Sequence, residues 1–338
     1  MTGPALIALL LAAVALVGVG LMLPNDIRVE REITVDAAPA TVFAVVDGVR
    51  QSIKWLPWAG RDPKARYELS GPPVGVGAHL RWYSDDPDVG SGSLEIVEAV
   101  PAERVAMKLV FGRFATGSRS LVELTPEGAG TRVRWSLQMD TGGDMLLRYR
   151  GLFLEHRVGP RYEDGLRRLK TLVESLPRDD LSSIAAELVT VAPRPLAMIA
   201  GAAGPDDDVP TMLAERYARI EAFASAQGRT PLGEPMTITR AYDAATHAWL
   251  FDAARELDRS CTSSEDAGIR CEYGYEGLAL RSSHMGPYDK LAPVYGALGA
   301  TARAMGLDDN GETWEQYPQP PLSVPPEQQS TWVYWPVR

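Results

Sequence analysis

Glu315 lies between two aromatic residues, Trp314 and Tyr317, in the segment Glu312–Pro318 (ETWEQYP). A carboxylate neutralises a positive charge, and the faces of aromatic rings attract cations. Both features favour a flat or cationic apolar ligand. The same carboxylate is a candidate general base, with Tyr317 or Tyr288 as a hydrogen-bond donor. A solvent-exposed carboxylate on a strand is the simpler alternative.

Further aromatic residues of the C-terminal half are candidates to line the same ligand cleft. Tyr273 and Tyr275 are two positions apart, which places both side chains on one face of a strand. Trp332 lies in the closing strand-like segment Thr331–Trp335, whose side chains alternate between two faces. We therefore expect Tyr273, Tyr275 and Trp332 near Glu315.

The N-terminal half carries its own tryptophans but no catalytic pair. Trp55 and Trp58 flank a short loop (WLPW), and Trp82 lies in a predicted strand. These indole rings either line an apolar ligand cavity or belong to the core. No nucleophile stands out beside a base in this half, and we assign no catalytic residue.

The two cysteines, Cys261 and Cys271, flank a polar stretch that contains glycine (TSSEDAGIR). If this stretch is a hairpin loop, the thiols can pair across its base and stabilise the fold by about 3 kcal/mol. Such a disulfide indicates an oxidising compartment. The alternative is two free thiols. No histidine or further cysteine lies at metal-ligand spacing nearby, so we expect no metal site.

The 19 residues Ala5–Leu23 (ALIALLLAAVALVGVGLML) carry no charged side chain. At about 1.5 Å rise per residue, a helix of this length crosses the hydrocarbon core of a bilayer. We expect a single-pass anchor within residues 1–27; a cleaved signal peptide and a buried core helix are the alternatives. Arg28 and Arg31 favour a cytoplasmic body, whereas the short uncharged N-terminus is typical of an export signal. The side of the membrane stays open.

The charge distribution argues against nucleic acid as a partner. The chain has 34 basic and 44 acidic residues, a net charge of −10, and Leu181–Arg338 alone has 12 basic and 21 acidic residues. An acidic domain repels phosphate backbones. No helix-turn-helix pattern or zinc-finger spacing is present, and the sequence names no protein partner.

The elements of the N-terminal half predict a curved antiparallel sheet around a long helix. A strand from Arg28 and a short helix over Pro39–Val46 precede six strand-like segments. These are Arg66–Ser70, Ala78–Ser84, Gly92–Val100, Arg104–Phe111, Ser118–Leu124 and Thr131–Met139. An apolar stripe predicts a closing helix over Leu146–Leu176. This helix-grip arrangement leaves a cavity between the sheet and the helix.

Five segments of residues 28–177 resemble the START-like (SRPBCC, polyketide cyclase/dehydrase) superfamily. They are ITVDAAPATVFAVV, the loop WLPW, Gly75–Gly77 before Trp82, GTRVRW at Gly130–Trp135, and VGPRYEDGLRRLK at Val158–Lys170. The resemblance implies a helix-grip fold with a small-molecule pocket. It implies no shared catalytic set.

Beyond a polar linker over residues 178–186, the chain shows a strand–helix–strands pattern that occurs twice. A first helix is predicted over Met212–Gln227, and Pro287 begins a second one. The predicted strands are Glu187–Val191, Leu196–Ala200, Met236–Asp243, His247–Glu256, Glu272–Arg281 and Thr331–Trp335.

With HMGPY before the second helix and WEQYP after it, this half resembles the gyrase-inhibitor-like fold, the effector-binding domain of AraC- and MerR-type regulators. The matching positions are the HxGPY element at His284–Tyr288 and the ExY element at Glu315 and Tyr317. The resemblance implies that Glu315 lies in an aromatic cleft and pairs with cationic lipophilic ligands. Such regulators carry a helix-turn-helix, which this chain replaces with a START-like domain, so transcriptional regulation is not expected.

We therefore expect an α+β chain in four parts. These are an anchor in residues 1–27 (span 5–23), a START-like domain in 28–177, a linker in 178–186 and a gyrase-inhibitor-like domain in 187–338. The expected function is binding or sensing of hydrophobic, including cationic, small molecules at a lipid bilayer, with no cofactor. The alternatives are a hydrolase or cyclase with Glu315 as general base, and a protein-interaction module.

Overall fold

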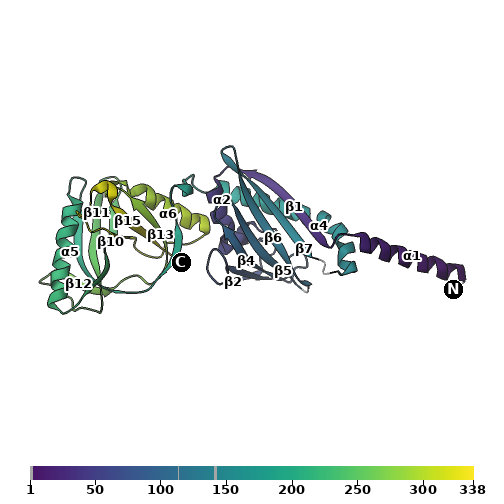
Figure 1. The fold of residues 1–338 in the computed structure, drawn as a ribbon, viewed down its shortest axis with the longest axis horizontal. Helices are drawn as coiled ribbons and strands as arrows, with labels where there is room; N and C mark the ends of the chain where they lie inside the picture. Colours follow the sequence, from purple (N-terminus) through teal and green to yellow (C-terminus); the bar gives the residue numbers. More distant parts are fainter. Residues whose placement is uncertain (1–2, 113, 141–142) are drawn as a thin grey trace. The chain divides into compact units, whose positions relative to one another are not determined.

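The computed structural model describes residues 3–112, 114–140 and 143–338, without the side chains of residues 3–9, 114–117, 147, 150 and 154. The chain divides into two compact units, one reaching Arg178 and the other comprising most of Asp179–Arg338 (Figure 1). Each unit combines one antiparallel sheet with helices, so the predicted α+β class is confirmed.

The first unit is built on a seven-stranded sheet in the order β1-β7-β6-β5-β4-β3-β2. Its strands β2 to β7 follow one another as hairpins, and β1 closes the far edge against β7. The strands are β1 (Asp26–Val35), β2 (Arg66–Ser70), β3 (His79–Tyr83), β4 (Gly92–Val100), β5 (Arg104–Phe111), β6 (Phe114–Glu127) and β7 (Gly130–Asp140).

Three helices complete the fold of this unit: α2 (Pro39–Val46), α3 (Val49–Trp55) and α4 (Met145–Glu174). The apolar stripe of α4 is buried at Tyr162, Leu166, Leu169 and Val173, three or four residues apart. It packs against β1, β7 and the two short helices, as a helix-grip fold requires (Figure 1). Helix α3 was not predicted, because its seven residues are too few for an apolar period.

Helix α1 (Gly3–Met22) covers most of the predicted anchor. Its end contacts the start of α4, where the Arg148 guanidinium donates to the Gly20 carbonyl at 3.3 Å. Residues 5–9 of the predicted span lie outside the residues whose side chains are described. Within the described part of the chain, no helix is long and apolar enough to cross a membrane. Large apolar side chains are exposed at Leu10, Leu11, Val14, Leu16, Val17, Val19, Leu21 and Met22.

The second unit is built on an eight-stranded sheet in the order β12-β9-β11-β10-β14-β15-β13-β8. Helix α5 (Val209–Ala226) packs on β9, β10 and β11 (Figure 1). Helix α6 (Ala292–Met305) follows β13. The strands are β8 (Glu187–Val191), β9 (Pro195–Ala203), β10 (Pro231–Asp243), β11 (Ala248–Leu257), β12 (Ile269–Tyr273), β13 (Gly277–Met285), β14 (Trp314–Gln316) and β15 (Ser330–Val337).

The predicted strand Glu272–Arg281 is in fact two strands, β12 and β13. Gly277, with φ of +143°, lies in a region that favours glycine, and it begins β13 after a three-residue break. The break carries the chain from one edge of the sheet to the opposite side, where β13 lies between β15 and β8. The helix expected at Pro287 begins at Ala292, after a short 3-10 turn over Tyr288–Lys290.

Candidate functional site

Glu315 is the middle residue of β14, a three-residue strand at the centre of the eight-stranded sheet. It pairs with Thr237 of β10 on one side and with Val333 of β15 on the other. Directly opposed residues point to the same face of a sheet, so Glu315 shares its face with Thr237 and with Ala253 beyond it. Helix α5 covers that face, and Glu315 is 6% exposed.

Both carboxylate oxygens of Glu315 accept a tyrosine hydroxyl. Tyr295 donates from α6 to Oε1 at 2.6 Å, and Tyr317 donates to Oε2 at 2.5 Å. The Tyr317 hydroxyl also lies 2.6 Å from Thr237 Oγ1. Burial raises the pKa of the Glu315 carboxyl, although the two hydroxyl donors act in the opposite direction. The carboxyl therefore keeps its proton to a higher pH than an ordinary glutamate.

Four tyrosines from different segments surround this carboxylate, and we call them the tyrosine cage: Tyr217, Tyr288, Tyr295 and Tyr317. Tyr217 reaches in from α5 and donates to the Met236 carbonyl at 3.0 Å. The rings of Tyr288 and Tyr317 meet edge to face, with centroids 5.1 Å apart. Burial raises the pKa of all four hydroxyls, and the nearby Glu315 charge adds to the rise at each, so they remain neutral donors.

Two members of the cage were missed as site residues at the sequence level. Tyr217 and Tyr295 belong to the apolar stripes of predicted helices, and such positions are ordinarily assigned to the core. A tyrosine in such a stripe is itself a signal, because its hydroxyl needs a polar partner once the ring is buried. The partner here is the central strand pair of β10 and β14.

The HxGPY segment brings Tyr288 into the cage through a glycine turn. Gly286 has φ of +134°, and a Cβ at this position would lie 3.2 Å from His284 Nε2. Beyond the turn, the Gln329 side chain donates a hydrogen bond to the Tyr288 hydroxyl. The structure thus places His284 beside the turn and Tyr288 in the cage.

Three buried polar atoms of β13 and β15 have no hydrogen-bond partner within the described residues: Ser282 Oγ, Thr331 Oγ1 and His284 Nε2. Ser282 opposes Val333, which opposes Glu315, so Ser282 points to the cage side of the sheet. Thr331 opposes His284 in the same strand pair. Unpaired buried polar atoms are rare in folded proteins, and here they add free hydrogen-bonding capacity to the face of the sheet that carries Glu315.

Contrary to expectation, Trp314 and Trp332 do not flank Glu315. Successive side chains of a strand alternate between faces, so Trp314 points away from the cage. Its ring stacks on Tyr334, with centroids 4.6 Å apart, and Trp332 packs against the same cluster. Tyr275 joins this cluster with its ring 5.5 Å from that of Trp314. Tyr273 shares the opposite face with Ile269 and Cys271, where it is 65% exposed and its hydroxyl accepts from Ser260 Oγ.

The predicted tryptophans of the first unit are all in its interior. Trp55 and Trp82 are fully buried, and Trp58 is 7% exposed. Trp58 stacks on Trp82 at 4.6 Å, and Trp55 meets Trp135 edge to face at 5.1 Å. The indole N–H groups of Trp55, Trp58 and Trp82 have no hydrogen-bond partner within the described residues. The interior is therefore aromatic with three unused donors.

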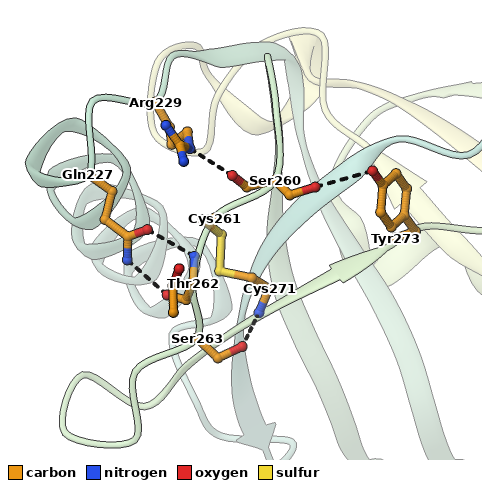
Figure 2. Close-up of a disulfide and its surroundings, with 8 residues drawn as sticks. All are labelled: Gln227, Arg229, Ser260, Cys261, Thr262, Ser263, Cys271 and Tyr273. Atoms are coloured by element: carbon orange, nitrogen blue, oxygen red, sulfur yellow. Dashed lines mark hydrogen bonds between the residues drawn. A yellow bond between two sulfur atoms is a disulfide. The ribbon is translucent and has the colours of Figure 1, made fainter.

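Cys261 and Cys271 form a disulfide that ties the loop after β11 to edge strand β12 (Figure 2). The loop is also held by Gln227, whose side chain bonds both the N–H and the carbonyl of Thr262 at 2.9 and 2.8 Å. Ser260 Oγ donates to the Tyr273 hydroxyl at 3.2 Å. No group of three metal-ligating side chains occurs within the described residues.

Comparisons with known proteins place the first unit in a family. The family model described as polyketide cyclase / dehydrase and lipid transport matches residues 26–174. No curated protein matches the chain.

Solved structures with less than 25% identity also match. A protein from Chromobacterium violaceum is 19% identical, with 45% of this chain and 99% of that chain covered and a TM-score of 0.33. The EcmrR C-terminal domain is 14% identical, with 46% and 98% covered and a TM-score of 0.41. A hydrolase from Listeria innocua is 17% identical, with 45% and 91% covered and a TM-score of 0.34. On the family match, residues 26–174 form a polyketide cyclase/dehydrase (SRPBCC-like) domain.

Proposed function

We propose that this protein binds lipophilic cations at Glu315, in the tyrosine cage of its second unit. The observation that carries the proposal is a single carboxylate, 6% exposed, with both oxygens held by tyrosine hydroxyls. Four tyrosine rings supply the π faces that a cation prefers. The resemblance of this unit to gyrase-inhibitor-like domains supports the same ligand class.

The energetics of the cage favour a cationic ligand over an anionic or a neutral polar one. An ionised carboxylate in a buried site is costly unless a positive charge accompanies it. A cation that reaches Glu315 supplies that charge and keeps the desolvated pair together. It has to displace Tyr295, which is half-buried and precedes Gly296, a position with open space around it. The α6 side of the cage is thus the proposed entrance.

The first unit adds an apolar binding domain to this proposal. Its family model is described by cyclisation, dehydration and lipid transport, which supports an apolar ligand. The buried rings of Trp55, Trp58 and Trp82 offer an aromatic lining with unused N–H donors. The proposed protein therefore handles apolar small molecules in both units.

We also propose that residues 5–23 tether the protein to a bilayer, where such ligands are concentrated. The support is the charge-free sequence and the exposed apolar side chains between Leu10 and Met22. Alkaline carbonate extraction of membranes from expressing cells should leave the full chain in the pellet and release a variant lacking residues 5–23. Equal release of both proteins would contradict the tether.

A hydrolase that uses Glu315 as general base is the second candidate function. The observation that favours it is the raised pKa of the buried Glu315 carboxyl next to neutral tyrosine donors. Turnover of an activated ester such as 4-nitrophenyl acetate, lost in Glu315→Gln, would select this function. Stoichiometric binding without turnover selects the binding protein.

The test of the binding proposal is calorimetric titration of the full chain with tetraphenylphosphonium. Saturable binding is expected for the wild-type protein and for Tyr242→Phe, a control tyrosine that is 54% exposed and lies outside the cage. Glu315→Gln is expected to weaken binding by at least about tenfold, as loss of a charge partner does. Equal affinity of wild type and Glu315→Gln would overturn the proposal.

A further inference from the structure

The face of the second sheet opposite the tyrosine cage holds a cavity of about 730 Å³. This volume is in the range of pockets that take drug-sized molecules. Glu315 does not line it, whereas its neighbours Trp314 and Gln316 do. The cavity and the cage therefore lie on the two sides of β14.

The floor of the cavity is apolar and aromatic. Trp314 and Tyr334 are stacked nearly parallel, with 9° between their planes, and both are at least 93% buried. The Tyr275 ring borders Trp314, and the Tyr275 hydroxyl is used in a bond to the Leu278 carbonyl at 2.8 Å. Met198 and Met236 extend the floor with flexible apolar side chains. Such a floor suits a flat ring system.

Two chain connections border the cavity. The segment between β8 and β9 contributes Ala192 and Arg194, and the segment between β12 and β13 contributes Gly274 and Tyr275. The two connections are joined by a hydrogen bond from the Gly274 N–H to the Arg194 carbonyl at 2.8 Å.

Charges in the lining are already compensated. Arg194 pairs with Glu256 at 3.5 Å. Arg240 pairs with the buried Asp252 at 2.6 Å and also with Glu312. The remaining pairs are Arg281 with Glu187, and Glu272 with Arg270. Arg281 also lies over the Trp332 ring at 4.4 Å.

An ionic ligand would gain no unpaired partner here and would have to break an existing pair. We propose that this cavity is a second binding site, for an uncharged, flat aromatic or polycyclic molecule, separate from the cation site at Glu315. The ligand stacks on the rings of the floor and is covered by the two joined connections. The site rests on its own lining and does not depend on the cage binding a cation.

The test uses the full chain and Nile red, an uncharged planar dye that fluoresces in apolar surroundings. Tyr275→Ala removes the ring that borders Trp314 and is expected to weaken dye binding by about three- to tenfold, the range of one aromatic contact. Trp314→Leu removes the floor and is expected to weaken it further. Tyr242→Ala is the control, since Tyr242 is a tyrosine outside the lining.

Two further readouts locate the dye. Amide hydrogen exchange at Gly274 should slow when the dye binds, because the ligand holds the joined connections closed. Glu315→Gln should leave the dye affinity unchanged, and tetraphenylphosphonium should not displace the dye. Dye affinity that is unchanged in both cavity variants, or is lost in Glu315→Gln, would overturn the second site.

Discussion

Replacing Tyr295 with phenylalanine tests whether the cage holds Glu315 as a charged group. The substitution removes one hydroxyl and keeps the ring, so Oε1 of Glu315 loses its 2.6 Å donor. A hydrogen bond to a charged group contributes about 1.5–3 kcal/mol, and a buried acceptor left unpaired costs a similar amount. We therefore expect Tyr295→Phe to lower the free energy of unfolding of the second unit by about 2 kcal/mol at alkaline pH.

The pH dependence of this loss follows from the direction of the Glu315 pKa shift. Burial raises the pKa of the folded carboxyl above its ordinary value of 4.5, so unfolding releases a proton at pH values between the two. Stability of the second unit therefore falls as the pH rises through this window and recovers as the pH falls below it. The Tyr295 hydroxyl lowers the pKa of Glu315, so its removal raises that pKa further. In the variant, the fall in stability should therefore extend to a higher pH than in the wild type.

The assay is a double-mutant cycle of Tyr295→Phe and Glu315→Gln, measured by urea unfolding of the full chain at about pH 5 and about pH 8. The coupling energy should be about 2 kcal/mol at the higher pH and smaller at the lower one. Tyr242→Phe is the control and should change stability by less than about 0.5 kcal/mol. A coupling energy near zero at both pH values, or one that grows on acidification, would refute the reasoning.

Three further predictions concern stability, each measured by urea unfolding. Replacing Cys261 and Cys271 together with serine should lower the free energy of unfolding by about 3 kcal/mol, because the disulfide restricts the unfolded chain. Reductant should have the same effect on the wild type, and no loss in either case would contradict this reasoning. Asp252→Ala removes the carboxylate, 2% exposed, that Arg240 and Arg270 share, and should cost about 1.5–3 kcal/mol, against less than about 1 kcal/mol for the exposed Glu187→Ala. Trp82→Ala should cost about 3–5 kcal/mol, and a change below about 1 kcal/mol would show that its site is not packed.

The fold of the first unit was predictable because its strands and helices carry complete periods. The segments Gly92–Val100 and Arg104–Phe111 match β4 and β5 residue for residue. The predicted helix Leu146–Leu176 agrees with α4 to within two residues at each end. Each has enough residues to show an alternation of two or a spacing of three and four. Helix α3 and the break before Gly277 lack that length, so only the folded chain reveals them.

The candidate site was predicted less completely because it depends on which face of its strand each side chain occupies and on packing between segments far apart in the sequence. Glu315 and Trp314 are adjacent in the sequence and for that reason point to opposite faces of β14. With only three residues, β14 shows no alternation that would assign its faces. Tyr295 reaches Glu315 only because α6 lies over the face of the sheet that Glu315 occupies. A local motif does not contain that information.

The central claim is that Glu315 is the charge partner of a cationic ligand, and proton release on binding tests it most directly. Tetraphenylphosphonium is titrated into the full chain in buffers of different ionisation enthalpy between about pH 5 and about pH 8. Because burial raises the pKa of Glu315, a bound cation should expel its proton, and affinity should increase with pH. Wild type should release protons and Glu315→Gln should release none. Binding without proton release, with the same affinity in both proteins, would contradict the account.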